Sequence, residues 1–179
     1  MERIRMNKES TDRKRKKGKP LNFREVSGGI LSHSKYEKLK EFVAHGRVSC
    51  YEHSLRVARL CDRMARRIPV RWDYRSLIRG ALLHDYYLYD WHAPGRSFRW
   101  HGFRHPAIAS HLARRDFHLN DRECDMIRSH MFPLTLFSLP KSREAWLLVL
   151  ADKVAAMEET LDGWKKRFGG AGVTHKKNG

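Results

Sequence analysis

The residues of this chain best suited to chemistry are two histidines and two aspartates. His53 lies in "YEHSLRVARL", His84 and Asp85 end the apolar run "ALLHD", and Asp152 interrupts "LLVLADKVAA". A carboxylate on the buried face of a helix is costly unless it is paired or binds a metal. Imidazole and carboxylate together suit first-row divalent metals, so one ion would give these residues a common role.

Each of these residues also has an ordinary structural explanation. A single histidine on an apolar face is more often a hydrogen-bonded core residue than a ligand, and Asp152 could pair with one of the many arginines. His84 and Asp85 could simply mark the end of a helix. A metal is favoured because three separate segments each bring a histidine or carboxylate to an inward or terminal position.

The spacing of apolar residues predicts the helices that would position these side chains. The clearest spans 49–68, where apolar residues recur every three or four positions opposite a face of arginines. Helices are predicted at 34–46, 49–68, 73–85, 105–117, 120–131 and 142–161. Asp73, Asn120 and Ser142 are the expected N-caps, and Pro106 is expected in the first turn of its helix.

The segments between these helices are predicted to be irregular. Residues 21–34 contain the break Gly28–Gly29, and 91–104 and 132–140 are polar-aromatic and proline-bounded loops. No segment shows convincing strand alternation. The expected fold class is therefore all-α, as a single helical bundle.

Charge divides the chain into a domain and two basic ends. Of a net charge of +17, residues 1–20 contribute nine Lys/Arg against three Asp/Glu, and residues 162–179 contribute five against one. We expect 1–20 to be a disordered basic arm, 21–161 the helical domain and 162–179 a basic flexible tail. The arm suits RNA, DNA or another polyanion, although a solvated tail that only aids solubility has the same composition.

Several classes of protein are disfavoured by composition. The three cysteines form no CxxC pair, which argues against a disulfide framework or a thiolate zinc site and suits a reducing cytoplasm. No apolar run reaches the roughly 18–20 residues of a membrane span. The polar start "MERIRMNKES" has no apolar core of a secretory signal. A cytoplasmic protein without membrane contact is expected.

The order His53, His84-Asp85, Asp152 resembles the HD-domain superfamily of metal-dependent phosphohydrolases, whose signature is H…HD…D on an all-helical core. The flanking sequences "EHSLRVARL", "GALLHD" and "VLADKVAA" are similar too, and the resemblance covers residues 35–161. It implies hydrolysis of a phosphate ester with a divalent metal held by these four residues. Iron, manganese, zinc and magnesium are all compatible with such ligands.

Two further histidines resemble those of the variants that hold two metals. His105 opens "HPAIAS", which is similar to an HPxxGA segment with Ala109 in place of glycine, and His130 ends "DMIRSH". The resemblance implies that these two histidines hold a second metal and that Asp85 bridges the pair. Alternatively, His105 and His130 line the pocket of a single metal as substrate-binding or acid–base groups.

The resemblance does not extend to two known branches of the superfamily. The cyclic-di-GMP phosphodiesterase branch carries HDxGK and GYP motifs, whereas here "YYLYDW" follows the doublet and no GYP occurs. The alarmone hydrolase branch has further acidic residues after the doublet, and Asp90 matches that spacing poorly.

A mechanism follows from this metal chemistry. A divalent ion activates bound water and polarises a phosphoryl oxygen. Asp85 is the candidate to orient the attacking water. The resemblance includes an Asp-Lys pair, so Lys153, which follows Asp152, is the first candidate to neutralise the phosphate. Arg56, one turn after His53, is the second, although a solvated basic face would contain the same arginines.

The loop after the doublet suggests the substrate. Its aromatic rings and arginines could stack on a nucleobase, which favours a nucleotide, although a packed lid would use the same rings. Arg96, Arg99 and Arg104 could reach the substrate from this loop, and His92 and His101 are expected at the rim. The competing hypothesis is a non-catalytic helical module of HD type that binds RNA or another polyanion through its basic arms.

Overall fold

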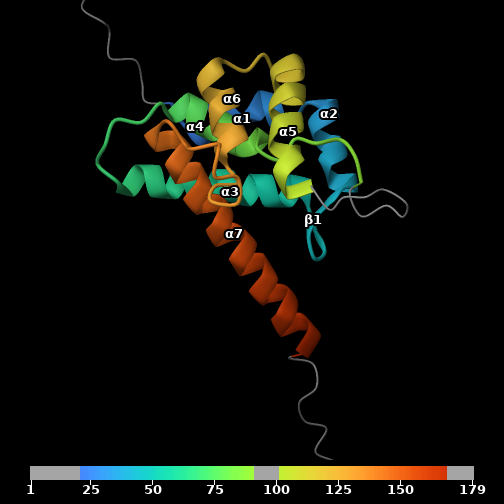
Figure 1. The fold of residues 1–179 in the computed structure, drawn as a ribbon. Coiled ribbons are helices and arrows are strands. Elements are labelled where there is room, and N and C mark those ends of the chain that lie inside the picture. Colours follow the sequence, from blue (N-terminus) through green and yellow to red (C-terminus); the bar gives the residue numbers. More distant parts are fainter. Residues whose placement is uncertain (1–20, 91–100, 169–179) are drawn as a thin grey trace, which may run out of the picture.

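The computed structural model describes residues 21–90 and 101–168, and these form a helical body around one core (Figure 1). The elements are α1 (Phe23–Leu31), α2 (Ser34–Glu37), the 3-10 helix η1 (Lys38–Glu41), β1 (Val43–His45), β2 (Val48–Ser49), α3 (Cys50–Arg67), α4 (Tyr74–Leu83), α5 (His101–Phe117), α6 (Asp121–Ser129) and α7 (Arg143–Phe168). The predicted all-α fold class is confirmed. The N-terminal arm and residues 169–179 lie outside the described residues.

Helix α3 is the centre of the body. It packs against α4 on one side and α7 on the other, and its buried face includes Val57, Ala58 and Cys61. Ser49 and Glu52 form a capping box at its start, where each side chain satisfies a free backbone N–H of the first turn. The helix predicted at 49–68 is confirmed.

The caps predicted for the other helices are present as well. Asp73 accepts a hydrogen bond from the Ser76 amide at the start of α4, and Asn120 forms a capping box at the start of α6. The Ser142 hydroxyl accepts from the Ala145 amide as α7 begins. These caps fix where each ligand-bearing helix starts.

Helix α7 is longer than predicted. It continues to Phe168 instead of ending at 161, so the first part of the predicted flexible tail is helical. Gly163 lies within it, and a single glycine costs a helix only about 1 kcal/mol, which weakens a helix without ending it. Figure 1 shows the C-terminal half of α7 crossing α3 and projecting from the body.

The N-terminal predictions fail in two places. Gly28 and Gly29 lie inside α1, where the capping box of Asn22 and the buried side chains of Val26 and Ile30 outweigh the glycine cost. The helix predicted at 34–46 is instead α2, η1 and the first strand of a two-stranded antiparallel hairpin. No strand had been expected, because strands this short carry no alternation to read.

The start of α5 also differs from the prediction. The helix begins at His101, so Pro106 lies inside it instead of in its first turn. The three cysteines are free and buried. Among the described residues, no helix combines the length and apolar character needed to cross a bilayer.

Candidate metal centre

Six side chains predicted as metal ligands lie together in the interior. They come from α3, the end of α4, α5, the end of α6 and α7, so nearly every long helix contributes one. All six are at least nine-tenths buried: His53, His84, Asp85, His105, His130 and Asp152. Residues far apart in sequence are thus brought together at one point of the core.

The first group joins α3, α4 and α7. The Nε2 atom of His53 lies 3.1 Å from Oδ1 of Asp152 and 3.3 Å from Nε2 of His84. Nε2 of His84 lies 3.6 Å from the same Asp152 oxygen. These ligand atoms lie within 4.8 Å of one another, close enough to share one ion.

Asp85 lies between this group and a second one. Its Oδ2 atom is 3.6 Å from Nε2 of His84, on the side of the first group. Its Oδ1 atom is 3.3 Å from Nε2 of His105 and 3.5 Å from Nε2 of His130, and these two nitrogens are 2.9 Å apart. One carboxylate oxygen therefore faces each group, the arrangement expected of a bridging ligand.

Backbone carbonyls fix the tautomers of two histidines. Nδ1 of His84 lies 2.8 Å from the Ala81 carbonyl oxygen, and Nδ1 of His130 lies 2.6 Å from that of Ile127. A carbonyl only accepts, so both Nδ1 atoms carry the proton. Each Nε2 atom then presents its lone pair to the centre, which is the form of histidine that binds a metal.

Glu159 holds the third histidine in the same way, and the sequence reasoning missed it. Its Oε2 atom lies 2.9 Å from Nδ1 of His53, deep in the interior. Arg56 approaches the other oxygen, with Nε at 3.3 Å from Oε1. The spacing between Glu159 and Asp152 could have indicated this role. Seven residues are two helical turns, so both carboxylates project from one face of α7.

The electrostatics of the centre favour a bound positive charge. Burial opposes ionisation of Asp85 and Asp152, but neighbouring histidines hold the pKa of both carboxyls well below the usual range. Burial lowers the pKa of His130 to about 4, so this imidazole is neutral at pH 7. Burial also disfavours a charged His53, yet hydrogen bonds to Asp152 and Glu159 raise its pKa to about 10. Without a metal, a proton supplies this charge.

The donor set fits a divalent metal. Imidazole lone pairs and ionised carboxylates converge, and acceptors without protons repel one another unless a cation lies between them. Oδ1 of Asp85 is buried and makes no hydrogen bond in the described part of the chain. Two groups of three potential ligand atoms are present, His53–His84–Asp152 and His84–Asp85–His130.

The HD domain family model matches residues 50–157, more than half of the chain. This chain belongs to the HD domain family. Proteins of this family are in general metal-dependent hydrolases. All six ligand candidates lie within the matched residues. Neither the curated proteins nor the solved structures compared with the chain gave a match.

The cationic residues predicted to bind substrate lie at different places in the HD domain. Lys153 borders the centre, with Nζ 2.7 Å from Oδ2 of Asp152 and a half-exposed side chain. Arg56 pairs with Glu159, the carboxylate behind His53, and not with a ligand candidate. Arg104 is exposed on α5, one residue before His105.

The remaining predicted contacts fall in or beside an undescribed segment. Arg96, Arg99 and His92 lie outside the described residues, as does the side chain of His101. Asp90 is exposed at the end of the described segment.

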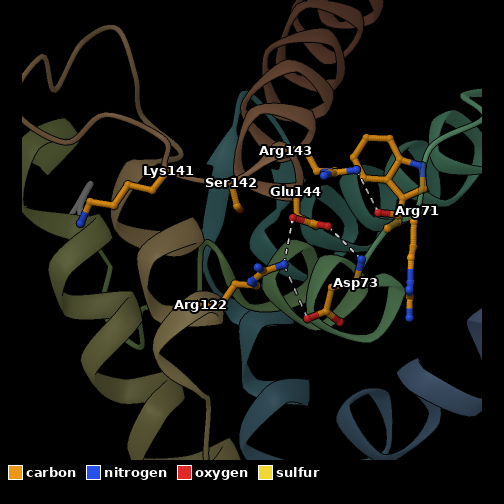
Figure 2. Close-up of a pocket in the computed structure, with 8 residues that line it drawn as sticks. Arg71, Asp73, Arg122, Lys141, Ser142, Arg143 and Glu144 are labelled. Carbon is orange, nitrogen blue, oxygen red and sulfur yellow. Dashed lines mark hydrogen bonds and ion pairs between the residues drawn. The ribbon is translucent and has the colours of Figure 1, made fainter.

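A polar hollow of about 570 Å³, lined by none of the six ligand candidates, is structural in character (Figure 2). Glu144 is buried there and accepts hydrogen bonds from the Asp73 amide at 2.8 Å and from Arg122 at 3.3 Å, one on each carboxylate oxygen. Arg143 donates to the Arg71 carbonyl at 3.2 Å. The buried carboxylate of Glu144 is already paired. We therefore interpret the residues of this hollow as a structural contact that holds the start of α7 against the start of α4.

Proposed function

We propose that this HD domain hydrolyses the phosphate ester of a nucleotide with metal-activated water. The observation that supports this is the arrangement of Nε2 atoms: His53, His84 and His130 each have Nδ1 engaged, so their Nε2 atoms converge beside two ionised aspartates. Hydrogen bonds link these atoms, between His53 and Asp152 and between His105 and His130, and a divalent ion would take the place of the shared protons.

The ligands divide between two positions in this proposal. His53, His84 and Asp152 would hold one ion, His105 and His130 a second, and Asp85 both. A divalent ion supplies an acidified water and an electrophile for the phosphoryl oxygen. The ionised carboxylate of Asp85 lies between the two groups, so it accepts a hydrogen bond from the attacking water and orients it toward phosphorus.

Lys153 is the proposed cation for the substrate phosphate. Its ammonium touches the buried Asp152 carboxylate, yet 43% of the side chain is exposed. It also approaches the His130 carbonyl at 3.4 Å, so it lies beside the ligand groups from both α6 and α7. A fixed positive charge here would offset the charge that develops on phosphate as the ester bond breaks.

The aromatic residues after the doublet support a nucleotide substrate. The Tyr87 ring lies 5.8 Å from that of His105 and 5.2 Å from that of Tyr89. Tyr87 is buried and Tyr89 is partly exposed, so the three rings in contact extend from the ligand cluster toward the surface. The partly exposed Tyr89 ring would offer a stacking surface to a base, which is worth about 1–3 kcal/mol in nucleic-acid sites, with Tyr87 packed behind it.

The test is hydrolysis by metal-reconstituted protein. Purified chain would be analysed for metal, reloaded separately with manganese, iron, zinc or magnesium, and offered a panel of nucleotides, sugar phosphates and a generic phosphoester. We expect His84→Ala to abolish both metal retention and turnover, and Lys153→Met to lower kcat/KM for the best substrate by about 100-fold.

The matched control is His111→Ala, which changes an exposed histidine on α5 away from the ligands. It should leave metal content and rate unchanged. Absence of metal binding together with turnover that survives His84→Ala would contradict the proposal. A preference for sugar phosphates over nucleotides would contradict only its substrate class.

A surface groove supports a second candidate function, polyanion binding. The groove, of about 520 Å³, lies along α3 and is lined in part by Arg47, Arg59 and Arg63. Within residues 21–90 and 101–168, no ion pair involves these three arginines. Unpaired guanidinium groups on α3 and on the turn between β1 and β2 suit a phosphate backbone, so the groove would extend the contact proposed for the basic arm.

A further inference from the structure

The projecting half of α7 carries an apolar stripe. Met157, Leu161 and Trp164 are 58%, 51% and 67% exposed, although each is a large apolar side chain. Together with the half-buried Val154 they follow a spacing of three, four and three residues, which places them on one side of the helix. This is the a/d spacing by which one helix packs against another.

The stripe begins where the core ends. Val154 still packs against the core cluster, whereas from Met157 to Lys165 every residue except Glu159 is exposed. A helical segment of this length is marginal by itself in water, and Gly163 weakens it further. Packing of the stripe against another helix would supply the missing stabilisation.

The charges beside the stripe identify that partner. Glu158 and Lys165 follow Met157 and Trp164 directly, so both flank the stripe on the same side. When two copies of such a helix pair antiparallel, residues at these equivalent flanking positions meet across the interface. Glu158 of each copy would then lie near the partner's Lys165, and the twofold axis would create two pairs of opposite charge.

We propose that the chain forms a homodimer through antiparallel pairing of the C-terminal halves of α7. Leu161 packs against the partner's Trp164 in two symmetric layers, and Met157 extends the contact on either side. The same surface of each copy meets itself, as a twofold interface requires. The dimer leaves the metal centre of each copy within its own body.

The experiment is sedimentation equilibrium of the full chain across micromolar concentrations. We expect twice the monomer mass of 21.1 kDa. Leu161→Asp should raise the dissociation constant by about 100-fold or more, because each dimer loses two buried leucines. Circular dichroism would verify that the variant keeps its helical body.

Charge reversal tests the orientation. Glu158→Lys and Lys165→Glu should each weaken the dimer by about tenfold, and the double variant should restore it, because the reversed pair is again complementary. Asp162→Lys is the control, since Asp162 lies farther round the helix from the stripe. A monomer at all concentrations, a dimer insensitive to Leu161→Asp, or failure of the double variant to restore binding would overturn the proposal.

Discussion

At the scale of single residues, the metal centre depends on what each imidazole does with its Nδ1 atom. Two backbone carbonyls and one carboxylate accept from these atoms, so the three Nε2 atoms face inward. Glu159 differs from the two carbonyls because it carries a full charge. It therefore makes the His53 imidazole more basic as well as fixing its tautomer.

We predict that Glu159→Gln lowers metal affinity by about 10–100-fold. The amide oxygen can still accept from Nδ1 of His53, but the negative charge is lost. The measurement is calorimetric titration of metal-depleted protein. Glu158→Gln, an exposed change next to it on α7, is the matched control and should bind metal as the parent does.

The pH dependence of binding provides a second readout for Glu159. Because the pKa of His53 is raised to about 10, its imidazole is protonated at neutral pH, and metal binding must release that proton. Affinity should therefore rise with pH in the parent protein, and less steeply in Glu159→Gln. A pH profile that Glu159→Gln leaves unchanged would show that this carboxylate does not act on His53.

At the scale of elements, the carboxylate of one aspartate contacts side chains from several helices and loops. The carboxylate of Asp116, near the end of α5, is 3% exposed and pairs with Lys35 of α2 and with Arg115, each at 2.8 Å. The Tyr86 hydroxyl donates to it at 3.1 Å, directly after the His84–Asp85 doublet. The junction thus secures the segment that carries Asp85.

This junction makes stability sensitive to acid. The Arg115 guanidinium, and then Lys35 and Tyr86, outweigh burial and hold the pKa of Asp116 well below its usual range. A carboxyl whose pKa is depressed by folding stabilises the fold above its unfolded pKa of about 4, and this contribution is lost as pH falls below that value.

We predict that Asp116→Asn lowers the free energy of unfolding by about 1–3 kcal/mol at pH 7, measured by urea denaturation. The difference between variant and parent should shrink progressively as the pH is lowered below about 4. Asp121→Asn, which changes an exposed ion pair with Arg114, should cost much less. A pH-independent difference would mean that the carboxylate charge is not what stabilises the junction.

At the scale of the whole molecule, the dominant property is its net charge of +17. Much of that excess lies in residues 1–20, and part of the rest lines the groove along α3. A polyanion could contact both regions, and the two contributions are separable because each neutralised phosphate adds to the salt dependence of binding.

We predict that deletion of residues 1–20 weakens binding of single-stranded RNA and flattens the plot of log affinity against log salt. Arg59→Glu combined with Arg63→Glu should add to this effect. Arg24→Glu combined with Arg75→Glu, on exposed positions of α1 and α4, is the charge-matched control. Fluorescence anisotropy at several salt concentrations measures both slopes, and equal loss in the groove and control variants would exclude the groove.

The local sequence pattern determined much of the secondary structure of this protein. Apolar periodicity and capping residues predicted α3, α4 and α6 because a helix buries one face and must satisfy its first amides within a few residues of sequence. Four of the ligand candidates were predicted from their residue types and positions, whereas His105 and His130 were predicted only from the resemblance to HD-type proteins that hold two metals. The break predicted at Gly28–Gly29 was wrong, because core contacts of α1 outweigh the cost of two glycines in a helix. Sequence spacing does not reveal such contacts.

Only the tertiary structure decided how those residues meet. It placed Asp85 between two groups of histidines, set Glu159 behind His53 and paired Arg56 with that glutamate. It also showed that α7 leaves the body with an apolar face exposed. The physical reason is the same throughout: residue type sets what a side chain can bond to, but the packing of distant helices sets which partner lies within reach.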